Sequence, residues 1–253
     1  MYFELTMPLL QMTPSRIALK LVFFTFGFMQ ANLIARLPRL IEMLSMDNRT
    51  LGIAFFTVAL GSVLSMPVAG WLTARTSDRS LAMVALPVYF ILFPLIPLMP
   101  GTNEFVGFFL ILGMGSGMFN VLMNAQAFII EKELKKPLMT SFHALFSIGM
   151  FAGAGCGSMF VKLDFDVFSH MLIICIASIS VLAFALRYFR DSTTASERQV
   201  FSLRLPSTSM LGIGTIIFCS IVGEGAISEW STTYMVNVVN VGQVLAPWAL
   251  SAF

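Results

Sequence analysis

Two asparagines four residues apart, Asn120 and Asn124, stand inside a long apolar run of the sequence. Residues at this spacing lie on one face of a helix. A polar side chain in hydrocarbon is costly unless it meets a partner or a watery cavity. The pair therefore indicates either a polar stripe that hydrogen-bonds a solute or amide bonds that only hold neighbouring helices together. Gln30, in an earlier apolar run, has the same two interpretations.

Glu224 is the strongest single candidate for chemistry in the sequence. A carboxyl group this far inside an apolar run usually serves an ion or substrate path. Removal from water disfavours the charged form, so Glu224 could take up and release a proton. Glu229 follows about 140° further around a helix, so the two carboxyl groups need not share a site. Its neighbour Trp230 favours a solvated carboxylate at the membrane interface.

His143 begins another apolar run and could titrate near neutral pH as a coupling group, or it could cap a helix or anchor a loop. Neither His143 nor His170 has acidic or thiol neighbours at the spacing of a metal site. The three cysteines are scattered through apolar runs without paired spacing. We therefore expect neither a metal nor another cofactor.

The elements that must position these side chains are membrane helices. Hydrophobic residues make up 57% of the 253 residues and charged residues 11%, against about 25% charged residues in an ordinary soluble domain. This composition excludes a soluble fold, and a net charge of +2 without a basic face gives no argument for nucleic acid. Runs long enough to cross a bilayer predict spans at residues 17–35, 51–72, 81–99, 105–130, 141–161, 171–189 and 210–234. An eighth apolar run starts at Val244.

Basic residues in the loops predict the orientation, because cytoplasmic loops carry the excess of lysine and arginine. Eleven lie on the side of the N-terminus: Arg16, Lys20, Arg75, Arg79, Lys132, Lys135, Lys136, Arg187, Arg190, Arg198 and Arg204. Four lie on the opposite side: Arg36, Arg39, Arg49 and Lys162. We therefore expect a cytoplasmic leader at 1–16, a six-helix bundle at 17–189, a cytoplasmic linker at 190–209 and the start of a second bundle at 210–253. This is the outline of the first part of a transporter made of two six-helix halves.

Three glycines at helical spacing, Gly149, Gly153 and Gly157, predict a face along which the fifth span packs closely on another helix. A membrane enzyme is the rival class, since serine proteases of the rhomboid type carry a Gly-x-Ser-Gly nucleophile on span four. Ser116 precedes a glycine here, but Met114 stands at the first glycine position and no histidine falls within predicted span six. The sequence therefore predicts a protein that is not an enzyme.

The loop between spans two and three resembles a signature of the major facilitator superfamily of secondary transporters. Gly70, Arg75 and Arg79 match that pattern, and Ala74 stands where the family has Asp. Members of the family use this loop to latch their two halves together, so the resemblance implies a gating role for the three matching residues. The glycine-rich segments of spans four and five are similar to two further motifs of the family.

The stretches 123–126, 142–149 and 223–230 resemble a bacterial branch near the fucose-type sugar permeases. This resemblance implies an all-α membrane protein, with a six-helix N-terminal bundle of the major facilitator fold plus the seventh helix and the start of the eighth. It implies a secondary transporter that moves a small polar solute, sugar-like or another metabolite, across the inner membrane, with protons as candidate coupling ions. The sequence looks truncated at its C-terminus beside that family, so the alternative is a membrane fragment that lacks a needed C-terminal half and does not transport.

Overall fold

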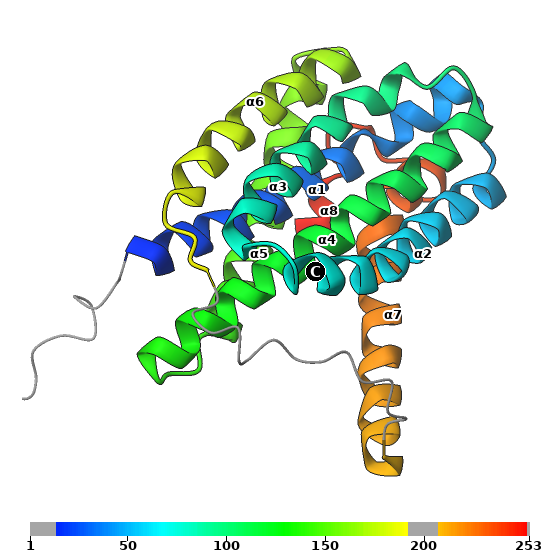
Figure 1. Ribbon diagram of the computed structural model, residues 1–253. Helices are drawn as coiled ribbons and strands as arrows, with labels where there is room; N and C mark the ends of the chain where they lie inside the picture. The colour runs from blue at the N-terminus through cyan, green and yellow to red at the C-terminus, as the bar shows by residue number, and fades with distance from the viewer. Residues whose placement is uncertain (1–13, 192–206, 252–253) are drawn as a thin grey trace, which may run out of the picture.

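The structure, a computed structural model, describes residues 14–191 and 207–251, and within these ranges it consists of helices joined by short loops (Figure 1). The helices are α1 (Pro14–Leu44), α2 (Asn48–Thr73), α3 (Asp78–Leu95), the 3-10 helix η1 (Ile96–Leu98), α4 (Thr102–Leu134), α5 (Met139–Lys162), α6 (Val167–Leu186), α7 (Thr208–Asn237) and α8 (Trp248–Ser251). Seven of them are long and apolar enough to cross a membrane. The predicted fold class is confirmed. The expected leader at 1–16 and linker at 190–209 lie mostly outside the described residues.

Two helix pairs dominate the packing of the first six helices: α1 lies along α5, and α2 lies along α4. Helix α6 packs on α1 and α3, and α3 packs on α4 (Figure 1). The core between them is rich in phenylalanine, with the rings of Phe23, Phe90 and Phe119 fully buried. Residues far apart in the sequence are thereby brought around one interior.

Glycines let the helices of both pairs approach one another closely. A Cβ added to Gly149 would meet the carbonyl oxygen of Phe24, and one added to Gly153 would lie 2.9 Å from the Cβ of Ala31. Gly157 lies against Ala35 in the same way, so all three glycines of the predicted face contact α1. Backbone-to-backbone contact of this kind is how membrane helices gain packing energy without a hydrophobic driving force.

Helix α1 is longer than the predicted span, because Arg36 is not a loop residue. The Arg36 side chain is buried; its Nε donates to Nδ1 of His170 at 2.8 Å and its Nη2 to the carbonyl oxygen of Phe165 at 2.9 Å. Nδ1 of His170 accepts, so Nε2 carries the proton and faces Oδ1 of Asn32 at 2.9 Å. The prediction that no histidine lies on the sixth helix is wrong, because α6 begins at Val167 and includes His170. Its two ring nitrogens contact Arg36 and Asn32 of α1, and not Ser116.

Side chains also fix the helix ends that face the loops. Asp47 accepts from the backbone N–H of Thr50 at 2.8 Å, and Asp166 from that of Ser169 at 2.9 Å. Hydrogen bonds from the side chain and the backbone of Thr50 and of Ser169 hold the pKa of the two carboxyl groups below its ordinary value. Oε1 of Glu131, at the end of α4, accepts from the first amides of the next helix, including that of Met139 at 2.7 Å. The caps set where α2, α6 and α5 begin.

Helix α7 contacts α1 and α8, while its first half extends away from the other helices (Figure 1). The segment after α7 folds back onto α5. There the Ser158 hydroxyl donates to the carbonyl oxygen of Val244 at 2.5 Å, and the Trp248 ring lies 3.3 Å from the Cβ position of Gly155. The eighth apolar run thus contributes only a four-residue helix to the described part of the chain.

Candidate solute-binding cavity

A cavity of about 840 Å³ opens between the helices of the bundle and α7. Four of the residues singled out in the sequence line it together: Gln30 from α1, Asn120 from α4, His143 from α5 and Glu224 from α7. Its walls are largely apolar, and the aromatic residues among them are Phe26, Phe55, Tyr89, Phe93, Phe109, Phe146 and Phe151. A cavity of this size with apolar walls and a few convergent polar groups is typical of small-molecule sites.

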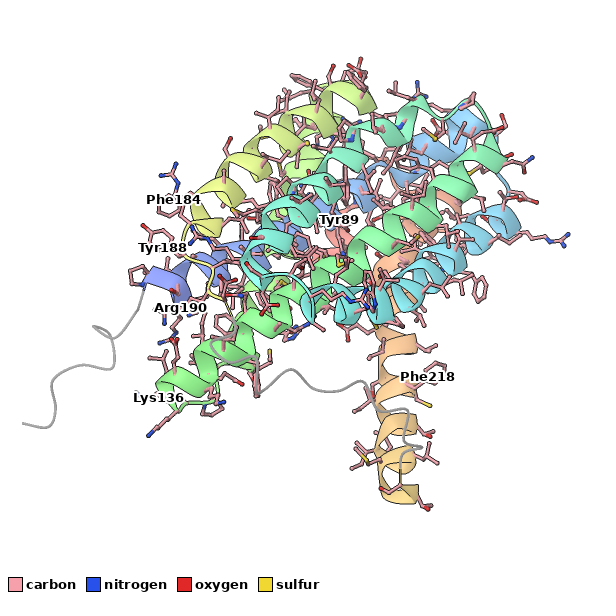
Figure 2. All side chains as sticks on the ribbon, viewed as in Figure 1. Tyr89, Lys136, Phe184, Tyr188, Arg190 and Phe218 are labelled. Carbon is pink, nitrogen blue, oxygen red and sulfur yellow. The ribbon has the colours of Figure 1, made fainter. Side chains whose placement is uncertain are left out.

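Tyr89 is the polar centre of the side formed by the first four helices. It is fully buried among them (Figure 2), and its hydroxyl interacts with the side chains of Gln30 and Ser116. Nδ2 of Asn120 donates to the backbone carbonyl of Ser116 at 3.1 Å. Helices α1, α3 and α4 thereby place two amides and two hydroxyls on one wall, where a hydroxylated solute could exchange hydrogen bonds with them.

Sequence reasoning missed Tyr89, because a tyrosine in an apolar run reads as an ordinary aromatic residue. The available signal was its place between Pro87 and Pro94, in a helix where a buried phenol needs a hydrogen-bonding partner. The partners come from α1 and α4, and only the fold brings them there.

The other side of the cavity carries two carboxyl groups from α7. Glu224 is exposed to the open part of the cavity, whereas Glu229 is half-buried. Both line the same cavity, although their spacing in the sequence did not require the two carboxyl groups to share a site. The five-residue step leaves them on different faces of the helix, but the cavity is wide enough to reach both. Ser228 of α7 lines the cavity as well.

His143 faces the cavity and does not cap a helix. Its ring meets Phe23 edge-on, with 5.3 Å between ring centroids. The N-terminus of its helix is capped instead by Glu131. The side chain is exposed, so it is available to a solute or to water in the cavity.

Asn124 and Gln126 do not line the cavity. Asn124 Nδ2 donates to the backbone carbonyl of Asn120 at 2.9 Å, a bond within α4. Gln126 is buried and hydrogen-bonds both backbone groups of Arg190, just beyond α6. The amides of α4 therefore divide: Asn120 faces the cavity, and Gln126 holds two helices together.

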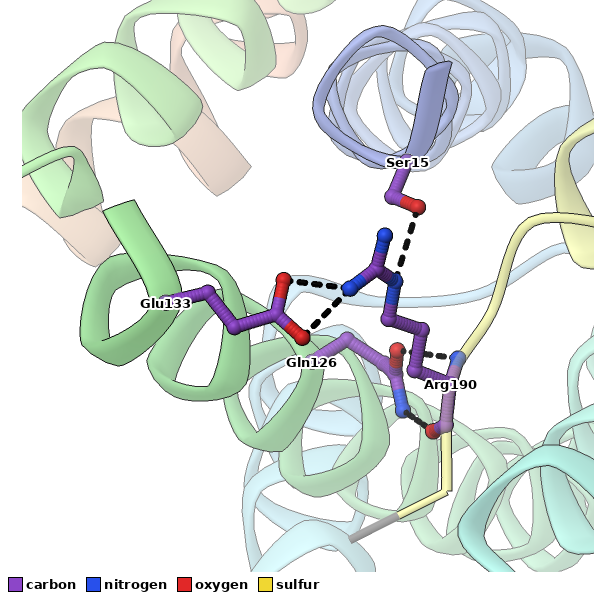
Figure 3. A network of polar contacts seen from close by, with 4 residues as sticks. All are labelled: Ser15, Gln126, Glu133 and Arg190. Carbon is purple, nitrogen blue, oxygen red and sulfur yellow. Dashed lines mark hydrogen bonds and ion pairs between the residues drawn. The ribbon is translucent and has the colours of Figure 1, made fainter. Parts of the chain in front are cut away.

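Arg190 is the centre of a polar network at the end of α4 (Figure 3). Its guanidinium forms an ion pair with Glu133, and its Nε donates to the Ser15 hydroxyl at 3.2 Å. The network joins the start of α1, the end of α4 and the segment after α6. It holds the three helix ends at this side of the bundle in fixed relative positions.

The three gating candidates lie in and beside the loop between α2 and α3: Gly70 in the last turn of α2, Arg75 in the loop and Arg79 in the first turn of α3. The Arg75 guanidinium lies over the Trp71 ring, 3.9 Å from its centroid. The backbone N–H of Arg79 donates to Oδ1 of Asp191 at 3.2 Å. Gly70 has no neighbour within 4 Å of a Cβ position, so packing does not require glycine there.

Comparison with known proteins gives a consistent result. Residues 19–253 match the family model of the Major Facilitator Superfamily. An uncharacterized MFS-type transporter of Yersinia pestis is 28% identical over 224 residues, covering 88% of this chain and 58% of that protein. The uncharacterized transporter y4wD of Sinorhizobium fredii is also 28% identical, over 86% of this chain and 58% of its own length. Membrane protein MosC of Rhizobium meliloti is 24% identical over 91% of this chain and 56% of its own.

The crystal structure of the nucleoside transporter NupG superposes with a TM-score of 0.61 at 13% identity, covering 89% of this chain and 55% of that one. A likeness at this identity shows the fold alone. The chain spans a little over half the length of the relatives it matches. With the family model matching nearly the whole sequence, the chain belongs to the Major Facilitator Superfamily of membrane transporters.

Proposed function

We propose that this chain forms the solute-binding part of a secondary transporter, which moves a small polar solute, sugar-like or another metabolite, across the bacterial inner membrane by alternating access. The observation that carries the proposal is the single cavity in which Gln30, Asn120 and Glu224 meet, although they are far apart in the sequence. Secondary transporters bind their solutes near the bilayer midplane, between bundles of helices.

The cavity supplies two kinds of contact to such a solute. Gln30, Asn120 and Tyr89 can exchange hydrogen bonds with hydroxyl groups, and the surrounding rings can cover the apolar face of the molecule. Glu224 is the first candidate for proton coupling, because an ionisable group inside a membrane helix bundle is rarely retained without such a role. His143 is the second, since it faces the same cavity.

The orientation and gating of the transporter follow from the loops. The excess of basic residues supports a cytoplasmic N-terminus and a cytoplasmic connection between α6 and α7. The domain plan of a bundle at 17–189, a linker at 190–209 and a second bundle from 210 is part of the proposal. The hydrogen bond from Arg79, at the start of α3, to Asp191 supports Gly70, Arg75 and Arg79 as a gating element beside that linker.

Binding to the cavity is the direct test, because it does not depend on the remaining length of the longer relatives. The purified chain is heated in detergent with a panel of sugars, polyols and nucleosides, and a solute that binds raises the unfolding temperature. Asn120→Ala should weaken the affinity for that solute about tenfold, the effect of one lost hydrogen bond in a buried site. Asn103→Ala, at the exposed start of α4, is the matched control.

Transport is then measured with the binding solute in proteoliposomes, with and without a proton gradient. Accumulation that depends on the gradient and is lost in Glu224→Gln supports proton coupling. A chain that inserts into the membrane but binds no member of the panel, or whose affinity is the same in Asn120→Ala, would contradict the proposal and favour a fragment without transport activity.

A further inference from the structure

We infer that the solute of this cavity carries a positive charge, as a small organic ammonium compound; the inference rests on the proposed function of the cavity. It deepens that proposal by naming the charge class of the solute. Three features of the lining support it: the signs of the ionisable groups, the aromatic walls beside them, and the hydrogen-bonding wall opposite.

The ionisable side chains in the cavity are Tyr89, His143, Glu224 and Glu229. Neither lysine nor arginine is present among the described lining residues. Two of these groups are carboxyl groups and one is an imidazole, so the acidic groups that can carry a full charge outnumber the basic one. A cavity with low-dielectric walls and charges of one sign concentrates solutes of the opposite sign. An anionic solute would meet two carboxylates and no fixed cation to pair with.

The aromatic walls add a second attraction for a cation. Phe55 lies edge-on to Trp230, the residue after Glu229, with 5.6 Å between ring centroids. Phe55 itself lines the cavity. Phe55 and Glu229 line the same cavity, so an ammonium group that reaches both would gain an ion pair and a cation–π contact. A neutral hydroxyl group at the same place gains neither.

The wall opposite α7 carries neutral hydrogen-bonding groups. The amide of Gln30, the Tyr89 phenol and the amide of Asn120 come from three different helices. They suit hydroxyl groups on the part of the solute that points away from its ammonium group. The two walls thus favour a molecule with a charged amine at one end and a polar or aromatic body at the other.

Two matched sets of probes test the charge of the solute. Tyramine, 4-hydroxyphenylethanol and 4-hydroxyphenylacetate differ mainly in the terminal group, and so do glucosamine, glucose and glucuronate. Their dissociation constants for the purified chain are measured at neutral pH and low salt. In at least one set, the dissociation constant of the amine should be lower than those of its neutral and acidic partners by about tenfold or more. The reason is that an ion pair with a carboxylate in the cavity favours the ammonium group.

Variants then assign the effect to the carboxylates. Glu229→Gln and Glu224→Gln should each reduce the preference for the amine, while Glu104→Gln, at the exposed start of α4 and outside the cavity, should not. Size-exclusion profiles and unfolding temperatures establish that the variants remain folded. If all three variants prefer the amine to the same degree, the carboxylates do not cause the preference and the inference is overturned.

The other outcomes separate this inference from the proposed function. Tighter binding of the neutral or the acidic member would overturn the positive charge and leave a solute-binding cavity intact. Absence of binding by all six probes, together with failure of the wider panel of sugars, polyols and nucleosides, would overturn the solute-binding function and the inference with it.

Discussion

The side-chain amide of Gln126 in α4 forms hydrogen bonds with both the N–H and the carbonyl group of the Arg190 backbone. Nε2 donates to the Arg190 carbonyl oxygen at 2.6 Å, and the Arg190 backbone N–H donates to Oε1 at 3.0 Å. The Gln126 side chain is buried, so both backbone groups depend on it where the chain leaves α6. One amide therefore satisfies both backbone groups of a residue that lies beyond the end of α6.

Gln126→Leu should lower the free energy of unfolding by about 1–3 kcal/mol, because it leaves two backbone groups without their partner. The measurement is the unfolding temperature in detergent. Gln243→Leu is the control, since Gln243 makes a single exposed contact with Glu42. Equal effects of the two substitutions would contradict the bridging role of Gln126.

The glycine contacts between α1 and α5 give a second prediction. Gly153→Ala would place a methyl group against the Phe28 carbonyl and 2.9 Å from the Ala31 Cβ, so the two helices must separate. We expect a loss of about 1–3 kcal/mol in stability, the usual effect of overpacking. Gly107→Ala in α4 is the control: with no atom within 4 Å, it should leave stability unchanged or raise it by about 0.5–1 kcal/mol. A stable Gly153→Ala variant would show that this contact is not close.

The α6 cap predicts a dependence of stability on pH. The hydrogen bonds from Ser169 lower the pKa of Asp166 in the folded chain. A carboxyl group with a lowered folded pKa stabilises the fold above its ordinary pKa of about 4, and the contribution is lost as pH falls through the lowered value. Asp166→Asn keeps the cap but removes this titration, so its unfolding temperature should fall less between pH 5 and pH 3. Asp164→Asn is the nearby control and should retain the full pH dependence.

Much of the fold was predictable because its signals are local. Apolar runs of membrane length identified seven helices, and the spacing of Gly149, Gly153 and Gly157 pointed to a close helix contact. Gln30, Asn120 and Glu224 could be identified as cavity candidates because a polar side chain within an apolar membrane helix is costly unless it meets a partner or a water-filled cavity. Each of these inferences uses one helix at a time.

What the sequence did not predict depends on pairs of helices. Tyr89 becomes polar lining only because α1 and α4 bring Gln30 and Ser116 to its hydroxyl. Glu229 lines the cavity only because α7 lies beside α1. Arg36 was assigned to a loop because a charge normally ends an apolar run, and its partner on α6 lies 134 residues away. Sequence spacing carries no information about such contacts.

The buried contact between Arg36 and His170 gives the last prediction. Replacing His170 by Phe keeps an aromatic ring against Phe160 but leaves the Arg36 Nε without its acceptor. Leaving a buried charged donor without its hydrogen-bond acceptor costs about 1–3 kcal/mol. His170→Phe should therefore lower the unfolding temperature strongly. In the Arg36→Met background the same substitution should cost much less, because the unpaired charge is gone. Arg39→Met, at an exposed arginine one turn along α1, should change neither result. Additive losses in the double variant would mean that Arg36 and His170 stabilise the fold independently.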